Sequence, residues 1–271
     1  MANNFWIVDT FNKNAFHGSP SAVFFVDTLD NEELFQNIAM EINTPDTIFV
    51  KDAKHNNFEV LCFSPNCKGM FFGNCLFAAS EVILKQNPNL PEFNLIHGNI
   101  IYNVTKQEDG QIRVIFSSAE INKASMPASL HSALDSELIV SIAESDMDLI
   151  VEIRSPKRVF NMTPNMDSLK TLEYDTVILT ADTHYEVDMD YDFCARVFAP
   201  NIGIFNDIVS PKAHSKLAAY WVDRMGKNKL IGYQSSDIRE GYTNALYEDE
   251  FTYISGNCVI TAVGEMLIKN L

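Results

Sequence analysis

The stretch FSPNCKGMFFGNCLFAA, Phe63 to Ala79, decides the fold, because a relaxed copy of it returns in the second half of the chain. The copy is FAPNIGIFNDIVSPKAHSKLAA, Phe198 to Ala219. Both copies open with Phe, a small residue and Pro, pass through a turn rich in Gly, Asn or Asp, and end in an Ala-rich apolar run. A single repeat separated by about half the chain indicates duplication and not a solenoid. It predicts two similar lobes.

Each copy predicts a strand, a loop and a helix. The first helix is expected from Gly73-Asn74 to about Lys85, and its body CLFAASEVIL is apolar almost all round, which is typical of a helix buried on most sides. The second is expected from about Lys212 to Arg224 and is also largely apolar. A sheet wrapped around each central helix would bury it. Several short strands with one such helix in each half favour an α+β fold over an alternating parallel α/β sheet.

Shorter elements are expected around these helices. A helix from Asn31 to Ile42, with Asp30 as its cap, carries an apolar face at four-residue spacing. A second short helix is expected over Asn165–Leu172, and the segment Cys258–Ile268 is left open between strand and helix. Expected strands include Phe5–Val8, Ala22–Val26, Thr47–Lys51, Phe58–Phe63, Ile100–Thr105, Leu149–Ile153, Val159–Met162, Val177–Thr180 and Leu230–Gln234.

Residues 118–137, SSAEINKASMPASLHSALDS, are small and polar and form the best candidate for a linker. We therefore expect an N-terminal lobe over residues 1–120 and a C-terminal lobe over residues 121–271. The last segment, from about residue 257 to 271, is a candidate to pack back on the N-terminal lobe.

The net charge limits the possible partners. With 20 basic and 36 acidic residues the chain carries −16. Nucleic acids and anionic membranes need positive surface, so neither is expected as a partner. A small anionic substrate remains compatible with this charge if the site supplies local positive ends.

The N-terminus MANNFWIVDTF lacks the pattern of a signal peptide, and no run is apolar enough for a membrane helix, so we expect a cytoplasmic protein. The five cysteines are an odd number, which favours free thiols in a reducing compartment. Cys62 and Cys67 do not form a CxxC pair, and no metal site is expected.

The two predicted helix starts suit a small acidic metabolite. Gly73–Cys75 and Pro211–Ala213 each lie where a loop enters a helix, and free backbone N–H groups at such an end hold carboxylates without Lys or Arg. Plain helix caps are the alternative interpretation of both.

Several segments resemble phenazine biosynthesis F-type isomerases, in order and at similar spacing. They are VDTFNKNAFHGSPSAVFFV, NTPDTIFV, FSPNCKGMFFGN, RVFAPNIGIFNDIVSPKAH followed by LAAYW, and ISGNCVITAVGE. The resemblance implies the diaminopimelate epimerase-like fold, an α+β fold of two pseudo-symmetric lobes, each a mixed β-barrel-like sheet around a central helix, with an active site between them. It also implies a cofactor-free isomerase in a biosynthetic process, a homodimer, and a small carboxylate substrate.

The resemblance also implies site residues, although not every motif is retained. Asp46 stands where the family has the glutamate that shuttles the proton, and it is one methylene shorter. Asn74 replaces the family's histidine, and an amide cannot carry a proton at neutral pH. In the second lobe Asp207 and His214 are retained, whereas Pro211-Lys212 replaces Gly-Ser. The predicted catalytic residue is Asp46, and the predicted substrate-binding residues are Gly73, Asn74, Asp207, Lys212, Ala213 and His214.

Purely structural alternatives stand beside these roles. Asp46 follows Pro45 and suits a turn, His214 suits a packed histidine, and Asn74 suits a helix cap. Two functions of different classes are therefore open. One is an active isomerase with Asp46 as its acid/base. The other is a relative without catalysis that keeps the fold as a small-molecule-binding or scaffold protein.

Overall fold

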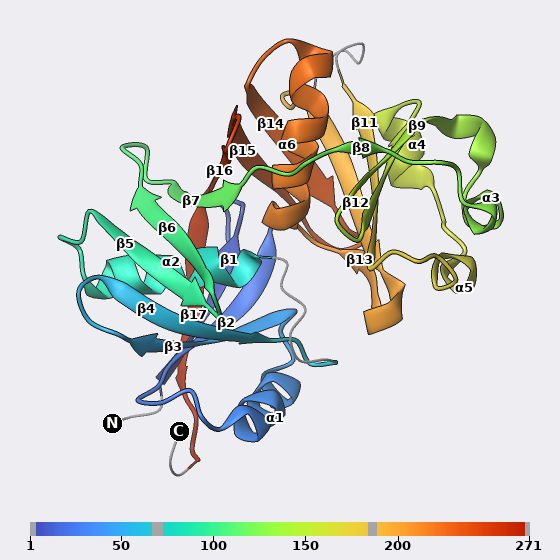
Figure 1. Ribbon diagram of the computed structural model, residues 1–271. Helices are drawn as coiled ribbons and strands as arrows, with labels where there is room; N and C mark the ends of the chain where they lie inside the picture. Colours follow the sequence, from blue (N-terminus) through green and yellow to red (C-terminus); the bar gives the residue numbers. More distant parts are fainter. Residues whose placement is uncertain (1–3, 67–72, 184–188, 269–271) are drawn as a thin grey trace. The chain divides into compact units, whose positions relative to one another are not determined.

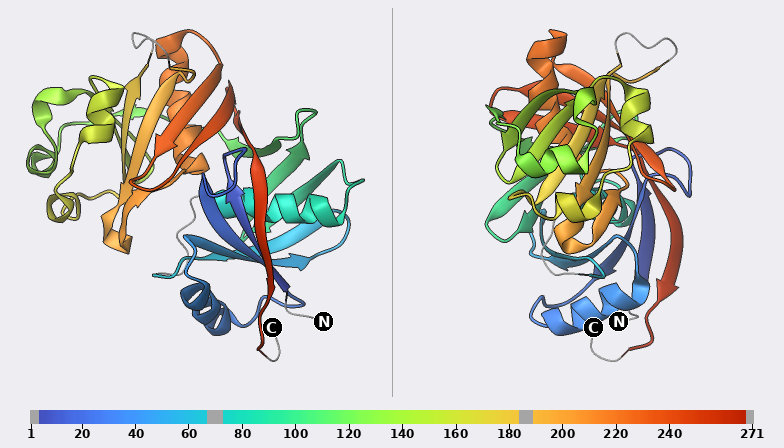
Figure 2. Two further views of the ribbon diagram at one scale, coloured as in Figure 1. Left: turned by 180° about the vertical axis from the view of Figure 1, so that it is seen from behind. Right: turned by 90° about the vertical axis from the view of Figure 1, so that its right-hand side faces the viewer.

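The computed structural model describes residues 4–66, 73–183 and 189–268 and divides the chain into two compact units (Figure 1). Unit 1 comprises Met1–Phe116 and Tyr253–Leu271, and unit 2 comprises Ser117–Thr252. The C-terminal segment thus belongs to unit 1. Its strand β17, Cys258–Glu265, pairs antiparallel with β1, Asn4–Thr10, and lies beside it in Figure 2. Of the two possibilities for this segment, the strand is therefore the one that forms.

Unit 1 is a mixed sheet around helix α2. From β1 the ladder continues antiparallel to β2, parallel to β3, antiparallel to β4, parallel to β5 and antiparallel to β6 and β7. The bounds are β2 Ser19–Phe25, α1 Glu32–Ile42, β3 Asp46–Asp52, β4 Asn57–Phe63, α2 Asn74–Gln86, β5 Glu92–His97, β6 Ile100–Lys106 and β7 Ile112–Ser117.

Unit 2 repeats this pattern of strand directions. β9 and β10 are antiparallel, β10 and β11 parallel, β11 and β12 antiparallel, β12 and β14 parallel, and β14 and β15 antiparallel. The bounds are β8 Asn122–Lys123, α3 Ala128–Ala133, β9 Ile139–Ser145, β10 Asp148–Ile153, α4 Pro156–Asn161, α5 Met166–Leu169, β11 Thr176–Asp182, β12 Phe193–Ala199, β13 Ile204–Asp207, α6 Pro211–Met225, β14 Lys229–Ser235, β15 Glu240–Glu248 and β16 Phe251–Gly256, which crosses the boundary. The same order of directions, with α2 and α6 at equivalent points, confirms the expected pseudo-symmetric α+β architecture.

Helix α2 is buried on most sides, as its composition predicts. Residues Asn74 to Ser80 are all buried, and so are Val82, Ile83 and Leu84. The opposite face of the unit 1 sheet packs on α1 through stacked aromatic rings. The ring centroids of Phe35 and Phe49 lie 4.0 Å apart. Both faces of the sheet are therefore core, which fixes the register of its strands.

Three local expectations are wrong. Asn31, and not Asp30, caps α1, because its side chain accepts a hydrogen bond from Leu34 N. Residues 159–162 fall largely in helix α4, because Pro156 suits the first turn of a helix, where no N–H is required. The expected linker is also folded. Its α3 buries Leu130 and Ala133 in the core of unit 2.

Gly18 lies in the loop that enters β2, in close contact with the backbone of Thr10. It has φ +66°, and an added Cβ would lie 1.9 Å from the carbonyl oxygen of Thr10. Gly98 has a similar φ of +60°, but an added Cβ would meet nothing within 4 Å.

We expect Gly18→Ala to destabilise the protein clearly more than Gly98→Ala. The positive φ costs both variants about 1–2 kcal/mol, and only Gly18→Ala adds the clash with backbone. Urea unfolding of the two variants measures the difference. Equal losses would contradict the close approach of Gly18 to Thr10.

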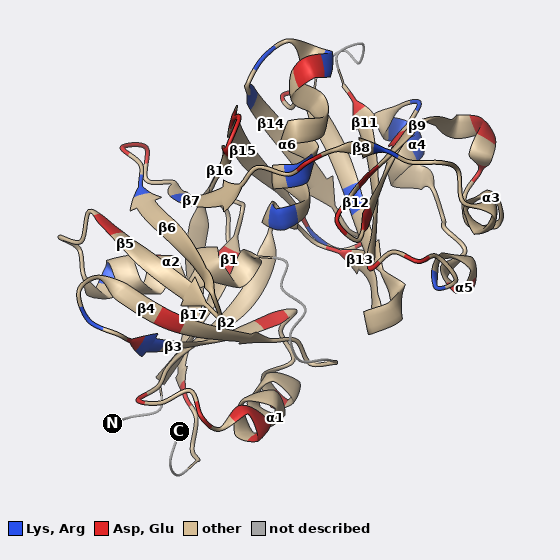
Figure 3. Cartoon of the chain, in the orientation of Figure 1, with Lys and Arg blue, Asp and Glu red and all other residues tan. Residues whose placement is uncertain are grey.

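Charged residues are spread over both units (Figure 3). Lys216 is the most deeply buried cation of the α6 region, with a side chain 5% exposed. Its Nζ lies 2.9 Å from carboxylate oxygens of Asp146 and of Asp148, and it donates to the carbonyl of Ser145. These bonds join α6 to the β9–β10 hairpin inside unit 2. None of the described helices is long and apolar enough to cross a membrane.

Candidate functional site

The first turn of α2 covers one face of strands β2, β3 and β4. Ser21 is the register partner of Asp46, and Ile48, two residues after Asp46, is the partner of Cys62. Side chains of register partners, and of residues two apart on a strand, point to the same face. Ser19, Ser21, Asp46 and Cys62 therefore share a face. Asn74, the first residue of α2, binds Ser19, so this is the face that α2 covers.

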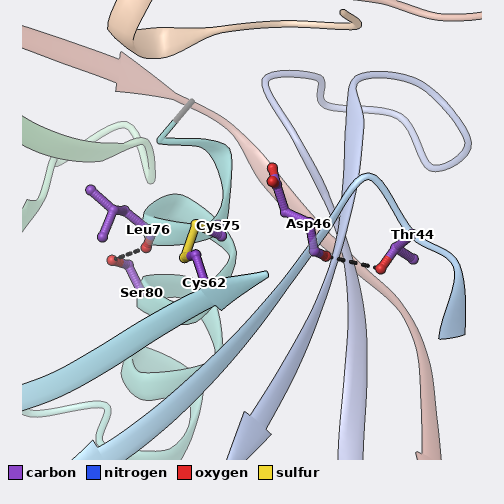
Figure 4. Close-up of a disulfide and its surroundings, with 6 residues drawn as sticks. All are labelled: Thr44, Asp46, Cys62, Cys75, Leu76 and Ser80. Carbon is purple, nitrogen blue, oxygen red and sulfur yellow. Dashed lines mark hydrogen bonds between the residues drawn. A yellow bond between two sulfur atoms is a disulfide. The ribbon is translucent and has the colours of Figure 1, made fainter. Parts of the chain in front are cut away.

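Asp46 begins β3 and is 4% exposed. Thr44 Oγ1 donates a hydrogen bond of 2.9 Å to the backbone carbonyl of Asp46, which fixes the chain at the entrance to the strand (Figure 4). The carboxylate therefore belongs to a buried strand position and not to an exposed turn. A buried carboxylate held on rigid backbone has the position that an acid/base requires.

Gly73 and Asn74 form the start of α2, but Asn74 does not cap it. The N-cap is Gly73, with φ 93°, and no side chain of the described residues caps the helix. The Asn74 amide turns instead to β2, where Nδ2 donates to Ser19 Oγ at 3.0 Å. Within the described part of the chain, Asn74 Oδ1 and Ser21 Oγ are buried and have no hydrogen-bond partner. Buried polar atoms in folded proteins are nearly always paired, so two unpaired ones at a helix start point to a ligand that pairs them.

Cysteine pairing differs from the expectation of free thiols. A disulfide joins Cys62 on β4 to Cys75, the second residue of α2 (Figure 4). Cys194 and Cys258 are not part of a disulfide in the described structure, and Cys67 lies outside the described residues. No CxxC motif marks the bridge in the sequence, because the two partners come from different elements. The bridge ties the first turn of α2 to the face that carries Asp46.

We expect loss of this disulfide to lower the free energy of unfolding by about 2–3 kcal/mol, because the bridge closes a short loop. Its partners are 13 residues apart in sequence. Cys62→Ala/Cys75→Ala and the wild type are compared by urea unfolding with and without a reductant. The reductant should destabilise the wild type and leave the double variant unchanged. Alkylation of both thiols in protein purified without reductant would contradict the bridge.

In unit 2, the start of α6 has its own side-chain cap, which the start of α2 lacks in the described structure. Ser210 is the N-cap of α6, and its Oγ accepts a hydrogen bond of 3.1 Å from Ala213 N. Pro211 has no N–H. The backbone N–H of Ala213 is thus used within the helix, and its predicted contact with a substrate has to come from other atoms. Lys212 is exposed, and its charge contributes to lowering the pKa of Asp146, a shift caused mainly by the hydrogen bond from Lys216.

Asp207 ends β13 and is 6% exposed. Its Oδ1 accepts a hydrogen bond of 2.9 Å from Ile208 N, whereas Oδ2 has no partner among the described residues. Burial raises the pKa of this carboxyl to about 7, against a smaller opposing effect of the Ile208 N–H. A carboxyl with this pKa can both accept and release a proton near neutral pH.

His214 is fully buried and both ring nitrogens are engaged. Nδ1 contacts Thr243 Oγ1, and Nε2 lies 3.1 Å from Gln234 Oε1. Burial lowers the pKa of the imidazole to about 3, so the ring is neutral. Since Gln234 Oε1 can only accept, Nε2 carries the proton and Nδ1 accepts from the Thr243 hydroxyl. The imidazole is therefore a packed side chain, which is the structural alternative that the sequence offers for His214.

Gln234 extends this network to the loop before α6. Its Oε1 accepts from Ser210 N at 3.0 Å, and its Nε2 donates to the carbonyl of Asp207 at 3.1 Å. One side chain thus holds both ends of the segment from Asp207 to Ser210. Sequence reasoning does not find this role, because the contact with Asp207 links residues 27 apart, which no local pattern reveals.

No group of three or more His, Cys, Asp or Glu side chains in the described residues could hold a metal ion. The groups that the sequence singled out fall into two sets, one at the start of each central helix. Unit 1 brings together Asp46, Asn74 and the two serines of β2, and unit 2 brings together Asp207, His214 and Gln234. Each set contains at least one buried oxygen without a partner in the described structure.

Comparison with known proteins identifies relatives over the whole chain. An uncharacterized isomerase of Halalkalibacterium halodurans is 24% identical over 99% of this chain and 100% of its own. An uncharacterized isomerase of Pseudomonas aeruginosa is 28% identical over 99% of this chain and 100% of its own. The crystal structure of a phenazine biosynthesis protein of the PhzF family from Enterococcus faecalis superposes with a TM-score of 0.87, at 25% identity, over 99% of this chain and 100% of that one.

A predicted epimerase from Pseudomonas aeruginosa shares the fold, with a TM-score of 0.80 at 16% identity over 99% of this chain and 100% of that one. The family model PhzC-PhzF, described as phenazine biosynthesis-like protein, matches residues 8–263. Two of these relatives are named as isomerases, whereas the predicted epimerase shows a likeness of fold alone. The chain belongs to the phenazine biosynthesis-like family, PhzC-PhzF.

Proposed function

We propose that the protein is a cofactor-independent isomerase that moves a proton between carbon atoms, or between faces of one carbon, of a small carboxylate. The observation that carries the proposal is the buried Asp46 carboxylate on the sheet face under the first turn of α2. Relatives named as isomerases over the full chain length support the reaction class.

Asp46 takes the proton from carbon and returns it at the new position. A carboxylate can do both, because its protonated form is the acid of the second half of the reaction. The carboxylate of the substrate binds the backbone N–H groups at the start of α2, where the helix dipole favours negative charge. Asn74 contributes hydrogen bonds only, since its amide does not titrate.

In unit 2, we propose Asp207 as a substrate-binding residue, as the family resemblance implies. Its Oδ2 lacks a partner in the described structure, and its pKa of about 7 allows it to donate a hydrogen bond as a neutral acid. Gln234 holds the backbone at Asp207 and at Ser210, and the neutral His214 is hydrogen-bonded to Gln234 Oε1. We assign these two residues to positioning. Lys212 and Ala213 complete the proposed binding set.

The experiment incubates the protein in ²H₂O with a panel of cyclic and acyclic carboxylates and follows carbon-bound deuterium by mass spectrometry. An isomerase should incorporate deuterium into at least one of them, with product formation at a related rate. The same preparation, studied by light scattering, tests the homodimer that we propose from the family resemblance. We also propose a biosynthetic process on that resemblance, and we keep the cytoplasmic location that the sequence predicts.

A binding or scaffold protein without catalysis is the second candidate. The specific observation in its favour is that the start of α6 offers few backbone N–H groups to a substrate. Pro211 has no N–H, and the N–H of Ala213 is hydrogen-bonded to Ser210 Oγ. Carboxylate binding by calorimetry without any deuterium uptake would favour this candidate over the isomerase.

A further inference from the structure

Glu81 is the one position between Asn74 and Leu84 of α2 that is not buried. Its carboxylate forms no hydrogen bond or ion pair with another described residue. Burial raises the pKa of this carboxyl, and the charges of Lys106 and Lys85 oppose the shift. Charges that are partly buried in folded proteins are normally paired, so the unpaired Glu81 carboxylate points to a ligand that pairs it.

An open pocket of about 690 Å³ lies beside Glu81. It is lined by the second half of α2, by the loop that follows this helix, and by the end of β6 with the turn after it. All of its lining residues belong to unit 1. Pockets that hold small molecules in proteins have volumes of about 300–1,000 Å³. The pocket is therefore large enough for a metabolite.

The charged residues of the pocket suit a ligand that carries two opposite charges. Two acids, Glu81 and Glu108, and two lysines, Lys85 and Lys106, line it. Neither lysine forms an ion pair with the Glu81 carboxylate, although both charges act on it. A carboxylate only accepts hydrogen bonds, and an ammonium only donates them. A ligand ammonium therefore pairs with Glu81, and a ligand carboxylate pairs with the lysines.

Ligands with a single charge fit this lining less well. An amine pairs with Glu81 but meets the like charges of the two lysines. A carboxylate pairs with the lysines but brings another negative charge near Glu81. A zwitterion satisfies both signs at once. Four further lining residues are apolar and favour a ligand with an apolar side chain; they are Leu84, Pro88, Leu90 and Pro91.

We propose that this pocket is a second small-molecule site, which binds a free amino acid with an apolar side chain. The ligand ammonium pairs with Glu81, and the ligand carboxylate pairs with Lys85 and Lys106. The pocket is separate from the candidate active site, because Glu81 lies about two helical turns, or about 10 Å along the axis, after Asn74. The amino acid is therefore a ligand of its own and not the substrate of the proposed isomerase, and the pocket does not depend on that function.

Calorimetry on the intact chain compares each amino acid with two analogues that lack one charge. One series is leucine, isopentylamine and 4-methylpentanoate, and the other is phenylalanine, 2-phenylethylamine and 3-phenylpropanoate. Glycine keeps both charges but lacks the apolar side chain. In at least one series the amino acid should bind about 10-fold or more tightly than both analogues and than glycine, since each of these loses a charged pair or the apolar contact. No binding of either amino acid, or equal binding of an analogue in both series, overturns the proposal.

Variants of the pocket locate the amino acid that binds. Glu81→Gln keeps the size of the side chain and removes the charge that pairs with the ammonium, and Lys106→Gln removes a charge that pairs with the carboxylate. Each should weaken binding by about 10-fold. Neither position is buried, so both variants should fold, and thermal unfolding checks this. Glu41→Gln, at an exposed position of α1 outside the pocket, should leave binding unchanged. Unchanged binding in Glu81→Gln or in Lys106→Gln would place the amino acid outside this pocket and overturn the proposal.

Discussion

Asp46→Asn should lower deuterium uptake from ²H₂O into the bound carboxylate by about 10²–10⁴-fold, the usual contribution of a positioned acid/base. The amide has the size of the carboxylate and cannot take a proton from carbon. Binding of the ligand should change little, because the helix start and Asn74 are left intact. The rate is followed by mass spectrometry at saturating ligand, and binding by calorimetry.

Two further variants are compared with Asp46→Asn. Asp46→Glu keeps a carboxylate but moves it by one methylene, and a misplacement of about 1 Å can cost about 10²-fold in rate. Glu41→Gln removes an exposed acid from α1, five residues earlier, and should leave the rate unchanged. An unchanged rate in Asp46→Asn would show that another group moves the proton.

Asp207→Asn should change the pH dependence of stability. The pKa of Asp207 is raised from 3.8 to about 7 by burial, so the folded state holds a proton that the unfolded state has lost. The stability of the wild type should therefore fall as the pH rises from about 4 through 7. Since one pKa unit corresponds to about 1.4 kcal/mol, we expect Asp207→Asn to gain about 2–4 kcal/mol relative to the wild type at pH 8, and little at pH 4.

His214 changes the stability with pH in the opposite direction to Asp207, and its effect has to be separated from that of Asp207. Its pKa is lowered from 6.5 to about 3, so its contribution is present above pH 6.5 and is lost as the pH falls through 3. Comparison of Asp207→Asn with the wild type at each pH removes this effect, because both proteins keep His214. Urea unfolding between pH 4 and 8 is the measurement. A difference that does not grow with pH would show that the Asp207 carboxyl is charged when folded.

Much of the architecture follows from local patterns in the sequence. The apolar sequence CLFAASEVIL predicts a helix buried on most sides, and α2 is one. The duplicated Phe-x-Pro stretch predicts two similar lobes, and the strand directions repeat in units 1 and 2. Local patterns failed at Val159–Met162, because so short a stretch has no period that distinguishes a strand from a helix.

The site was less predictable because its contacts are long-range. Asp46 and the two helix starts could be located in the sequence, since they are motifs at fixed places. The partners of these residues could not be. Asn74 binds Ser19, 55 residues away, and Gln234 binds Asp207 and the buried His214. The Cys62–Cys75 disulfide depends in the same way on how β4 meets α2. Tertiary packing, and not local propensity, decides these pairs.

The central claim is that Asp46 moves a proton on the carbon of a bound carboxylate. It is tested most directly by the deuterium content of a carboxylate that binds, after incubation in ²H₂O with the wild type and with Asp46→Asn at equal occupancy. We predict uptake at one carbon with the wild type and a loss of about 10²-fold or more with the variant. Uptake at the same rate with both proteins, or binding with no uptake by the wild type, would contradict the claim.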